Sequence, residues 1–145
     1  MAIPGSVREL TVADAMIANP KTLGVDVGLA DAQRAFADDH VHMLLLTRDG
    51  VLRGTLVRQD LGPSLDPRRP VVALATLAGR TVSPDRSLNE AQHQLERSMA
   101  RRLAVTDASG RLLGLLCLKR SRDGFCSESD VLDRARARTT DRARV

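Results

Sequence analysis

The chain has 145 residues, of which 43% are apolar, as in an ordinary soluble domain, and this excludes a largely disordered protein. The longest apolar run, residues 112–118, contains a glycine and is far shorter than the roughly 20 residues that cross a bilayer, so no membrane span is predicted. The first residues have neither the basic start nor the apolar centre of a secretory signal. We therefore expect a cytoplasmic protein.

The net charge of +4 is concentrated at the C-terminal end. Residues 134–145 contain five arginines and one acid, whereas residues 1–133 contain 17 basic and 17 acidic residues. A terminal arginine cluster is more typical of a solvated, frayed helix end than of a nucleic-acid-binding face. With two Phe and no Trp or Tyr, the chain also lacks the stacking platforms of single-strand binders. Nucleic acid is thus not the expected partner, although binding through the tail stays open as an alternative.

Two helices are predicted in the first half of the chain. The first begins at Thr11, because Thr11 and Asp14 have the spacing of a capping box. After an extended piece at residues 21–25, the second helix begins at Gly28. Its apolar positions have helical spacing and predict one buried side, formed by Leu29, Ala32 and Phe36.

Two strands complete the first half. They cover residues 43–47 and 51–57, and Gly50 in the turn between them can supply a positive φ. The segment that follows, residues 62–69, contains Pro63 and Pro67 and is typical of a linker.

The second half shows the same order of elements. An extended piece at residues 80–83 precedes a helix that begins with the capping box of Ser87 and Glu90. Its apolar positions, again at helical spacing, are Leu88, Ala91, Leu95 and Met99. Strands at residues 102–106 and 112–118 follow, with Gly110 in the turn. Beyond a turn at residues 122–124, Ser127 begins a last helix that extends to about residue 138.

The two halves are an internal repeat. With a shift of 59 residues, eight of the 37 positions from 11 to 47 are identical to their counterparts, among them Val12 and Val71. With a shift of 60, Gly54 aligns with Gly114. Each unit of about 50 residues is marginal in isolation, so we expect the two to pack together. The predicted division of the chain is an N-terminal segment 1–10, unit one 11–61, linker 62–69, unit two 70–121, and a C-terminal helix and arginine-rich tail 122–145.

In this order the motifs resemble a tandem pair of cystathionine β-synthase (CBS) domains, also called a Bateman module. The residues that carry the resemblance are the segments 11–16 and 19–23, the helix after Asp26, and the closing segment 54–61. The resemblance implies an α/β (α+β) fold in which two units, each a short sheet packed with helices, form a pseudo-twofold pair. It further implies a homodimer and an adenosine-containing ligand, such as AMP, ATP, S-adenosylmethionine or NAD, in a cleft between units. No cofactor is required.

The family's closing motif, Gly-x-x-Thr/Ser-x-x-Asp, is incomplete in both units. In unit one Asp60 keeps the carboxylate that accepts ribose hydroxyls, but Val57 replaces the hydroxyl that contacts phosphate. In unit two Cys117 and Arg120 take these two positions, and a cation cannot accept ribose hydroxyls. Asp60 can also cap a helix beginning near Leu61, and neither role excludes the other.

Nine residues are the candidate ligand contacts. The unit-one pocket is expected to involve Thr22, Leu23, Val41, His42 and Asp60. In unit two Thr81 is the counterpart of Thr22, and three arginines are suited to gather on a phosphate. They are Arg101, Arg102 and Arg120. The alternative, that these arginines are solvated or paired with acids, stays open and is favoured.

Other chemistry finds little support. His40 and His42 lie on one face of an extended segment and could bind a metal with Asp38 or Asp39, but no further His or paired Cys has ligand spacing, so no metal is expected. Cys117 and Cys126 sit in apolar runs and are expected to be buried and reduced, a disulfide being the less favoured alternative, and Cys117 is expected to be inert. No Walker loop, G-x-G-x-x-G or G-x-S-x-G is present, and an enzyme is not expected.

Two functions remain. The first is a non-catalytic sensor that binds an adenosine-containing ligand and regulates an unidentified partner protein. The second is a dimeric interaction scaffold whose nucleotide pockets are degenerate and empty, with the arginine tail docking an acidic partner. Asp60, the segment 19–22 and the two glycines Gly54 and Gly114 favour the sensor. Val57, Cys117 and Arg120 favour the scaffold.

Overall fold

The structure is a computed structural model, and it describes residues 10–61, 68–119, 121 and 124–126. The predicted C-terminal helix and arginine tail, Arg120, and most of the N-terminal segment and of the linker lie outside these residues. Within the described part of the chain, no helix is long and apolar enough to cross a membrane.

The first half forms a three-stranded sheet and one helix. Strand β2 (Leu23–Gly24) pairs in parallel with β3 (Leu44–Arg48), which pairs antiparallel with β4 (Val51–Leu56). Helix α2 (Leu29–Phe36) packs its apolar side on this sheet. The buried residues of this layer include Leu29, Ala32, Phe36, Leu44, Leu46 and Leu56. The predicted second helix and the two strands are therefore confirmed, with ends that differ by a residue or two.

The second half forms a four-stranded sheet in the order β1-β7-β6-β5. Strand β5 (Thr81–Val82) pairs in parallel with β6 (Arg102–Thr106), and β6 pairs antiparallel with β7 (Leu112–Cys117). Helix α3 (Leu88–Ser98) is capped by the Ser87 hydroxyl, which accepts a hydrogen bond from the Glu90 backbone N at 3.3 Å. This confirms Ser87 as the predicted N-cap of α3.

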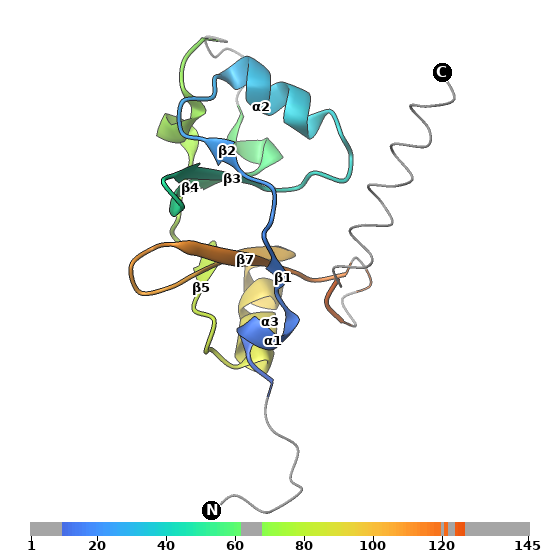
Figure 1. The fold of residues 1–145 in the computed structure, drawn as a ribbon. Helices are drawn as coiled ribbons and strands as arrows, with labels where there is room; N and C mark the ends of the chain where they lie inside the picture. The colour runs from blue at the N-terminus through green and yellow to red at the C-terminus, as the bar shows by residue number, and fades with distance from the viewer. Residues whose placement is uncertain (1–9, 62–67, 120, 122–123, 127–145) are drawn as a thin grey trace, which may run out of the picture.

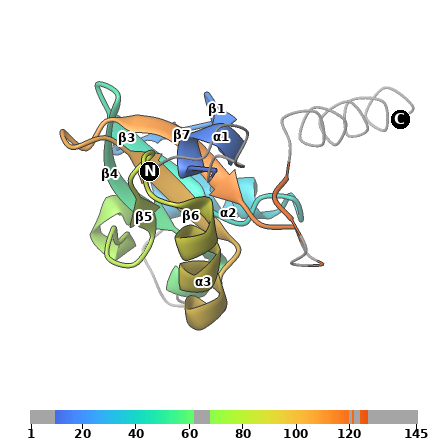
Figure 2. The same cartoon turned by 90° about the horizontal axis from the view of Figure 1, so that it is seen from below.

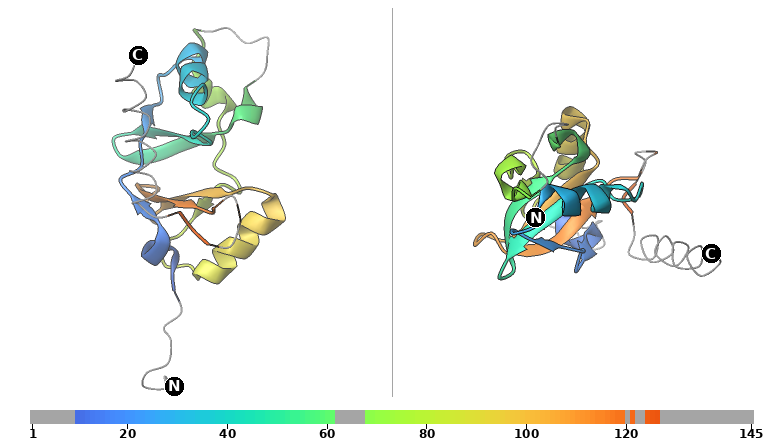
Figure 3. Two further views of the ribbon diagram at one scale, coloured as in Figure 1. Left: turned by 90° about the vertical axis from the view of Figure 1, so that its right-hand side faces the viewer. Right: turned by 90° about the horizontal axis from the view of Figure 1, so that it is seen from above.

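The two sheets face each other at the centre of the molecule and the long helices lie on the outside (Figure 1). Figure 3 shows the same layers edge-on, with α2 beyond one sheet and α3 beyond the other. Between the sheets Leu45, Leu52 and Ala104 are buried together. The turns of the two hairpins are joined symmetrically, since Leu52 N donates to Gly110 O at 2.9 Å and Leu112 N donates to Gly50 O at 3.0 Å.

Each half also packs a segment on the other half. Helix α1 (Val12–Ala15) and β1 (Ile17–Ala18) belong to unit one in sequence, but β1 pairs antiparallel with β7 and Val12 lies in the core of the second half. Figure 2, seen from below, places α1 and β1 beside β7. The counterpart in unit two is the 3-10 helix η2 (Val71–Leu74), whose Val71 lies in the core of the first half.

Backbone hydrogen bonds repeat this exchange in both directions. Val12 N donates to Arg86 O at 2.9 Å, and its counterpart Val71 N donates to Val27 O at 3.0 Å. The identity of Val12 and Val71 across the repeat thus reflects one buried position that is used twice. The predicted pseudo-twofold pair is confirmed, and its two units interlock more closely than the division at the linker suggests.

Glycine is required where the exchanged segments cross the sheets. A Cβ on Gly54 would lie 2.5 Å from the Ala75 Cβ, and a Cβ on Gly114 would lie 2.7 Å from the Ile17 carbonyl oxygen. Real Cβ atoms essentially never approach other atoms this closely. These two glycines, aligned by the repeat, therefore allow the opposite half to cross β4 and β7.

Two local features were not predicted correctly. Met99 was expected on the apolar side of α3, but it ends the helix in a left-handed conformation with φ 59° and is 83% exposed. Strand β1 was not predicted, because two residues are too few to produce a periodic pattern and contacts with the opposite half determine its conformation. The short helical stretch expected at the start of each unit is present, as α1 in unit one and as η2 in unit two.

Candidate functional site

Two clefts lie between the halves, and the first is named here the Lys21 cleft. It has a volume of about 350 Å³. Its first-half wall comes from the loop before β2, the end of α2 and the start of β3, and its second-half wall from β6 and β7. The lining residues are Ile17, Pro20, Lys21, Leu23, Arg34, Ala35, Asp38, His40, Val41, His42, Met43, Leu44, Leu45, Arg102, Leu115 and Cys117.

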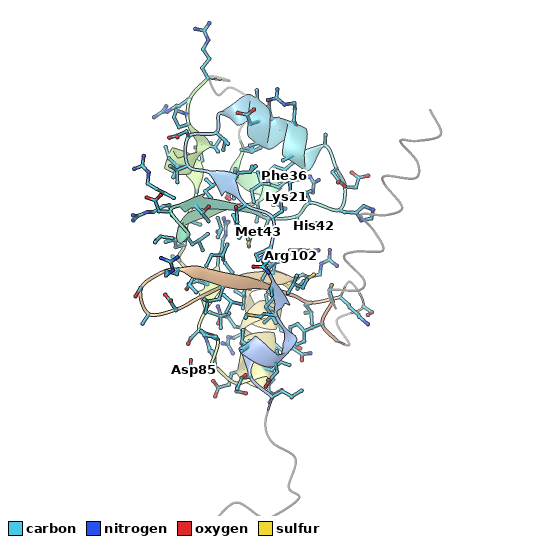
Figure 4. The ribbon with its side chains drawn as sticks, in the orientation of Figure 1. Lys21, Phe36, His42, Met43, Asp85 and Arg102 are labelled. Carbon is cyan, nitrogen blue, oxygen red and sulfur yellow. The ribbon has the colours of Figure 1, made fainter. Side chains whose placement is uncertain are left out.

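The Lys21 cleft combines an apolar interior with a charged rim. Lys21 and His42 lie near Met43 between the sheets, and Arg102 approaches from the second half (Figure 4). Arg34 pairs with Asp31 one turn earlier on α2, so its charge is already partly balanced. The only acid of the lining is Asp38, whose Oδ1 accepts a hydrogen bond from the His40 backbone N at 2.9 Å. The cleft is thus suited to a ligand with an apolar ring and a negative group.

The second cleft, named here the Arg80 cleft, has a volume of about 650 Å³. It is wider and more polar, and four arginines of its lining come from both halves. The lining residues are His42, Met43, Val57, Arg58, Gln59, Ala78, Gly79, Arg80, Ser98, Met99, Ala100, Arg101 and Arg102. His42, Met43 and Arg102 line both clefts and therefore lie between them.

Asp60 and Arg80 form a bidentate ion pair beside the Arg80 cleft. Arg80 Nη1 donates to Asp60 Oδ2 at 2.7 Å, and Arg80 Nη2 donates to Asp60 Oδ1 at 3.2 Å. The Val57 backbone N donates to Oδ2 at 2.9 Å, so Asp60 also closes the 3-10 helix η1 (Arg58–Asp60). The carboxylate therefore accepts three hydrogen bonds from the protein itself.

These contacts keep Asp60 ionised. Burial of the carboxyl raises its pKa, but the hydrogen bonds from Arg80 and from the Val57 backbone, with the positive charge of Arg80, lower it more. The pKa of Asp60 therefore lies below its ordinary value. An ionised carboxylate is the form that accepts hydroxyl hydrogen bonds, yet here its oxygens face an arginine of the other half.

Arg58 is held by the first half. Its Nη2 donates to the backbone oxygens of Phe36 at 2.5 Å and Asp38 at 3.0 Å, and its guanidinium lies 5.2 Å from the centre of the Phe36 ring. This arginine ties the end of β4 to the end of α2 through its Nη2 group.

The structure divides the nine predicted contact residues between several places. Leu23, Val41 and His42 line the Lys21 cleft, and Arg101 and Arg102 line the Arg80 cleft. Thr22, Asp60 and Thr81 line neither, and Arg120 lies outside the described residues. The structure thus does not bring Asp60 into one cleft with Leu23, Val41 and His42, because Asp60 pairs with Arg80 of the opposite unit.

The role of Asp60 as a cap is confirmed in a modified form. It accepts from Val57 N and closes a turn at residues 58–60, whereas a helix beginning near Leu61 would fall on residues 62–67, outside the described residues. The ion pair observed beside the Arg80 cleft is that of Arg80 with Asp60, and Arg80 was not one of the three arginines predicted to contact a phosphate.

The predicted set missed Lys21 and Arg80. They are counterparts under the shift of 59, they come just before β2 and β5, and each lines a different cleft. The repeat alignment contained this signal, since a positively charged residue recurs at one position.

The other chemistries were also compared with the structure. Among the described residues no group of three His, Cys, Asp or Glu side chains is placed to hold a metal ion. Cys117 and Cys126 are both 3% exposed, which confirms the prediction that they are buried.

Comparison with known proteins is consistent with this architecture. The model of the CBS domain family matches residues 64–120. The crystal structure of CBSX2 in complex with AMP is 24% identical, with a TM-score of 0.63, and the match covers 77% of this chain and 91% of that one. A CBS domain protein from Pyrobaculum aerophilum complexed with AMP is 18% identical, with a TM-score of 0.64, covering 78% and 95%. Hypoxic Response Protein I, with two coordinated zinc ions, is 24% identical, with a TM-score of 0.61, covering 86% and 98%. No curated protein sequence matches the chain.

Proposed function

We propose that this chain, which carries a CBS domain at residues 64–120 and folds as a CBS-domain pair, is a non-catalytic regulatory protein of the cytoplasm that binds an adenosine-containing molecule. The observation that carries the proposal is the Lys21 cleft between its two halves. Its volume of about 350 Å³ falls in the range of small-molecule sites and is sufficient for a nucleoside monophosphate.

The lining of the Lys21 cleft supports both parts of such a ligand. Leu23, Val41 and Leu115 offer apolar surface to a purine ring. Lys21 and Arg102, on opposite walls, are cations within the same lining and can neutralise a phosphate from two sides. AMP is bound in two of the similar solved structures, which supports this ligand class.

The Arg80 cleft is the weaker candidate. A ribose bound in this cleft would donate its hydroxyl hydrogen bonds to Asp60. The carboxylate oxygens of Asp60, however, already accept hydrogen bonds from Arg80 and from Val57 N. Binding there would have to break a charge-assisted pair whose side chains are about one-fifth exposed, 23% for Arg80 and 19% for Asp60. We therefore assign the ligand to the Lys21 cleft.

The test is a titration calorimetry and thermal-shift series with AMP, ADP, ATP, NAD, S-adenosylmethionine and adenosine. A ligand at about 100 times its dissociation constant adds about 2.7 kcal/mol to the free energy of unfolding, so Tm should rise by several degrees. Lys21→Ala and Arg102→Ala should each weaken a phosphorylated ligand by about tenfold or more, and adenosine much less. Arg53→Ala, which removes an exposed cation outside both clefts, is the matched control.

Asp60→Ala separates the two clefts. If AMP binding survives in Lys21→Ala and disappears in Asp60→Ala, the ligand occupies the Arg80 cleft and our site assignment is wrong, although the sensor function stands. If none of the six compounds binds at millimolar concentration, the sensor proposal itself fails.

The Asp60–Arg80 pair favours a second candidate, an interaction scaffold that binds no nucleotide. Arg80 already pairs with Asp60, which is the carboxylate of the closing motif. Val57 and Cys117 stand where that motif has the hydroxyl of a Thr or Ser. In that case the two halves form a rigid scaffold for binding a partner protein. We propose that two copies of the chain associate as a homodimer. Light scattering of the purified chain measures this association, and a monomer at micromolar concentration would contradict the proposed dimer.

A further inference from the structure

The two cysteines of the chain lie side by side in the second half. The Sγ atoms of Cys117 and Cys126 are 2.7 Å apart, although the residues are nine positions apart in sequence. Together with Ile17 of β1 they form a small buried cluster at the edge of the sheet. The sequence predicted buried, reduced thiols and disfavoured a disulfide between them, because no local pattern showed that the two residues are neighbours.

Backbone pairing holds the two residues opposite each other. Beyond the end of β7, Leu118 and Phe125 form an antiparallel bridge, and Cys126 N donates to Cys117 O at 2.7 Å. Lys119 N donates to Gly124 O at 2.8 Å on the other side of the bridge. Residues that face each other across such a hydrogen-bonded pair have Cα atoms about 5.5 Å apart, within the range that a disulfide spans.

The Lys21 cleft lies against this pair. Cys117 is among the residues that line the cleft, whereas Cys126 is not. Both cysteines are 3% exposed, and Cys126 packs with Cys117 and Ile17. Of the two buried thiols, Cys117 is therefore the one beside a space that an oxidant can enter, and Cys126 is the one that would resolve the product.

We propose that Cys117 and Cys126 are a peroxide-oxidation site that closes an intrachain disulfide. Cys117, as its thiolate, attacks one oxygen of hydrogen peroxide, the O–O bond breaks, and Cys117 carries a sulfenic acid while the other oxygen leaves as water. Cys126 Sγ then attacks the Cys117 sulfur, the S–S bond forms, and the sulfenic oxygen leaves as a second water. In total two thiols and one peroxide give one disulfide and two waters, and a dithiol reductant reverses the reaction.

The disulfide would join residue 126 covalently to the end of β7. It would close a loop of about ten residues and remove one thiol from the wall of the Lys21 cleft. The inference does not depend on which molecule the cleft binds, so it stands or fails separately from the proposed function.

The test treats the reduced, folded full chain with one or two equivalents of hydrogen peroxide, alkylates it in denaturant, and measures its mass. We expect both cysteines to escape alkylation and trypsin to release residues 112–119 linked to residues 123–134. Dithiothreitol should restore both alkylation sites. Two alkylated cysteines after treatment, sulfonic acids without a linkage, or links only between chains would overturn the proposal.

Two further measurements show that the bond forms in the native fold. Oxidised wild type should have a Tm at least about 4 °C above that of the reduced protein, because closing the loop restricts the unfolded chain. A lower Tm after oxidation would refute the native geometry. In Cys126→Ser, or in Cys126→Ala if the serine variant is insoluble, the oxidation should stop at a Cys117 sulfenic acid, which dimedone traps. If peroxide still blocks alkylation of these variants as a disulfide would, the proposed bond between Cys117 and Cys126 is also refuted.

Discussion

Replacement of Gly114 by alanine tests the crossing of the two halves most directly. The added Cβ would lie 2.7 Å from the Ile17 carbonyl oxygen and 2.8 Å from the Met16 sulfur. Met16 is the end of a flexible side chain and can turn away, but the Ile17 oxygen belongs to the backbone of β1, which pairs with β7 through Ile17 and Leu115. Relief of the clash therefore has to move β1.

The expected cost follows from two opposing effects. Insertion of a methyl group into a packed site costs about 1–3 kcal/mol. Replacement of a glycine restricts the unfolded chain and returns about 0.4–1 kcal/mol. The clash is the larger effect, so we expect the free energy of unfolding of Gly114→Ala to fall by about 1–2 kcal/mol and Tm by about 3–6 °C.

Urea unfolding followed by circular dichroism measures this change. Gly24→Ala is the matched control, since a Cβ on Gly24 meets nothing within 4 Å in the exposed strand β2, and its stability should stay within about 0.5 kcal/mol of wild type. If Gly114→Ala is as stable as Gly24→Ala, β1 does not cross β7 at the distance described, and the reasoning on the exchanged segments is wrong.

Three further perturbations act on single contacts. Asp60→Asn removes the ion pair with Arg80 and should lower the free energy of unfolding by about 1–2 kcal/mol at pH 7. Because the folded-state pKa of Asp60 is lowered, the difference between wild type and variant should be full above the ordinary pKa of 3.8 and should disappear as the pH falls through the lower, folded-state pKa. Urea unfolding in which the difference does not change with pH would contradict this. Ser87→Ala removes the cap of α3 and should cost about 1 kcal/mol in thermal unfolding, whereas Ser87→Asp should retain most of it. Met99→Gly relieves the left-handed cap and should stabilise by about 0.5–1 kcal/mol; a loss of stability would show that the exposed Met99 side chain makes a contact that matters.

Features that depend on neighbouring residues could be predicted from the sequence. The N-cap at Ser87, the apolar side of α2 and the glycine turn at Gly50 each depend on residues within about eight positions of one another, and the structure contains each of them. The internal repeat then extended these local predictions to a pair of units, because the same buried positions recur at a constant shift.

The candidate site was harder to predict because its contacts cross between the units. The cap that Asp60 makes to Val57 N is local and was anticipated as a capping role, but the pairing with Arg80 joins residues 20 positions apart and depends on how the halves face each other. The same holds for β1, whose two residues pair with a strand nearly a hundred positions away. No local pattern in the sequence encodes such distances.

The exchange of segments at Val12 and Val71 also determines how the protein can be divided. Expression of residues 70–145 alone would leave the second core without Val12 and its sheet without β1, and residues 1–61 alone would lack Val71 in the first core. A protease that cut between residues 62 and 67 would break the covalent connection, yet each product would still supply a missing piece of the other. The nicked chain should stay associated and unfold in a single transition. The smallest part of this chain that can fold stably is therefore the pair of units.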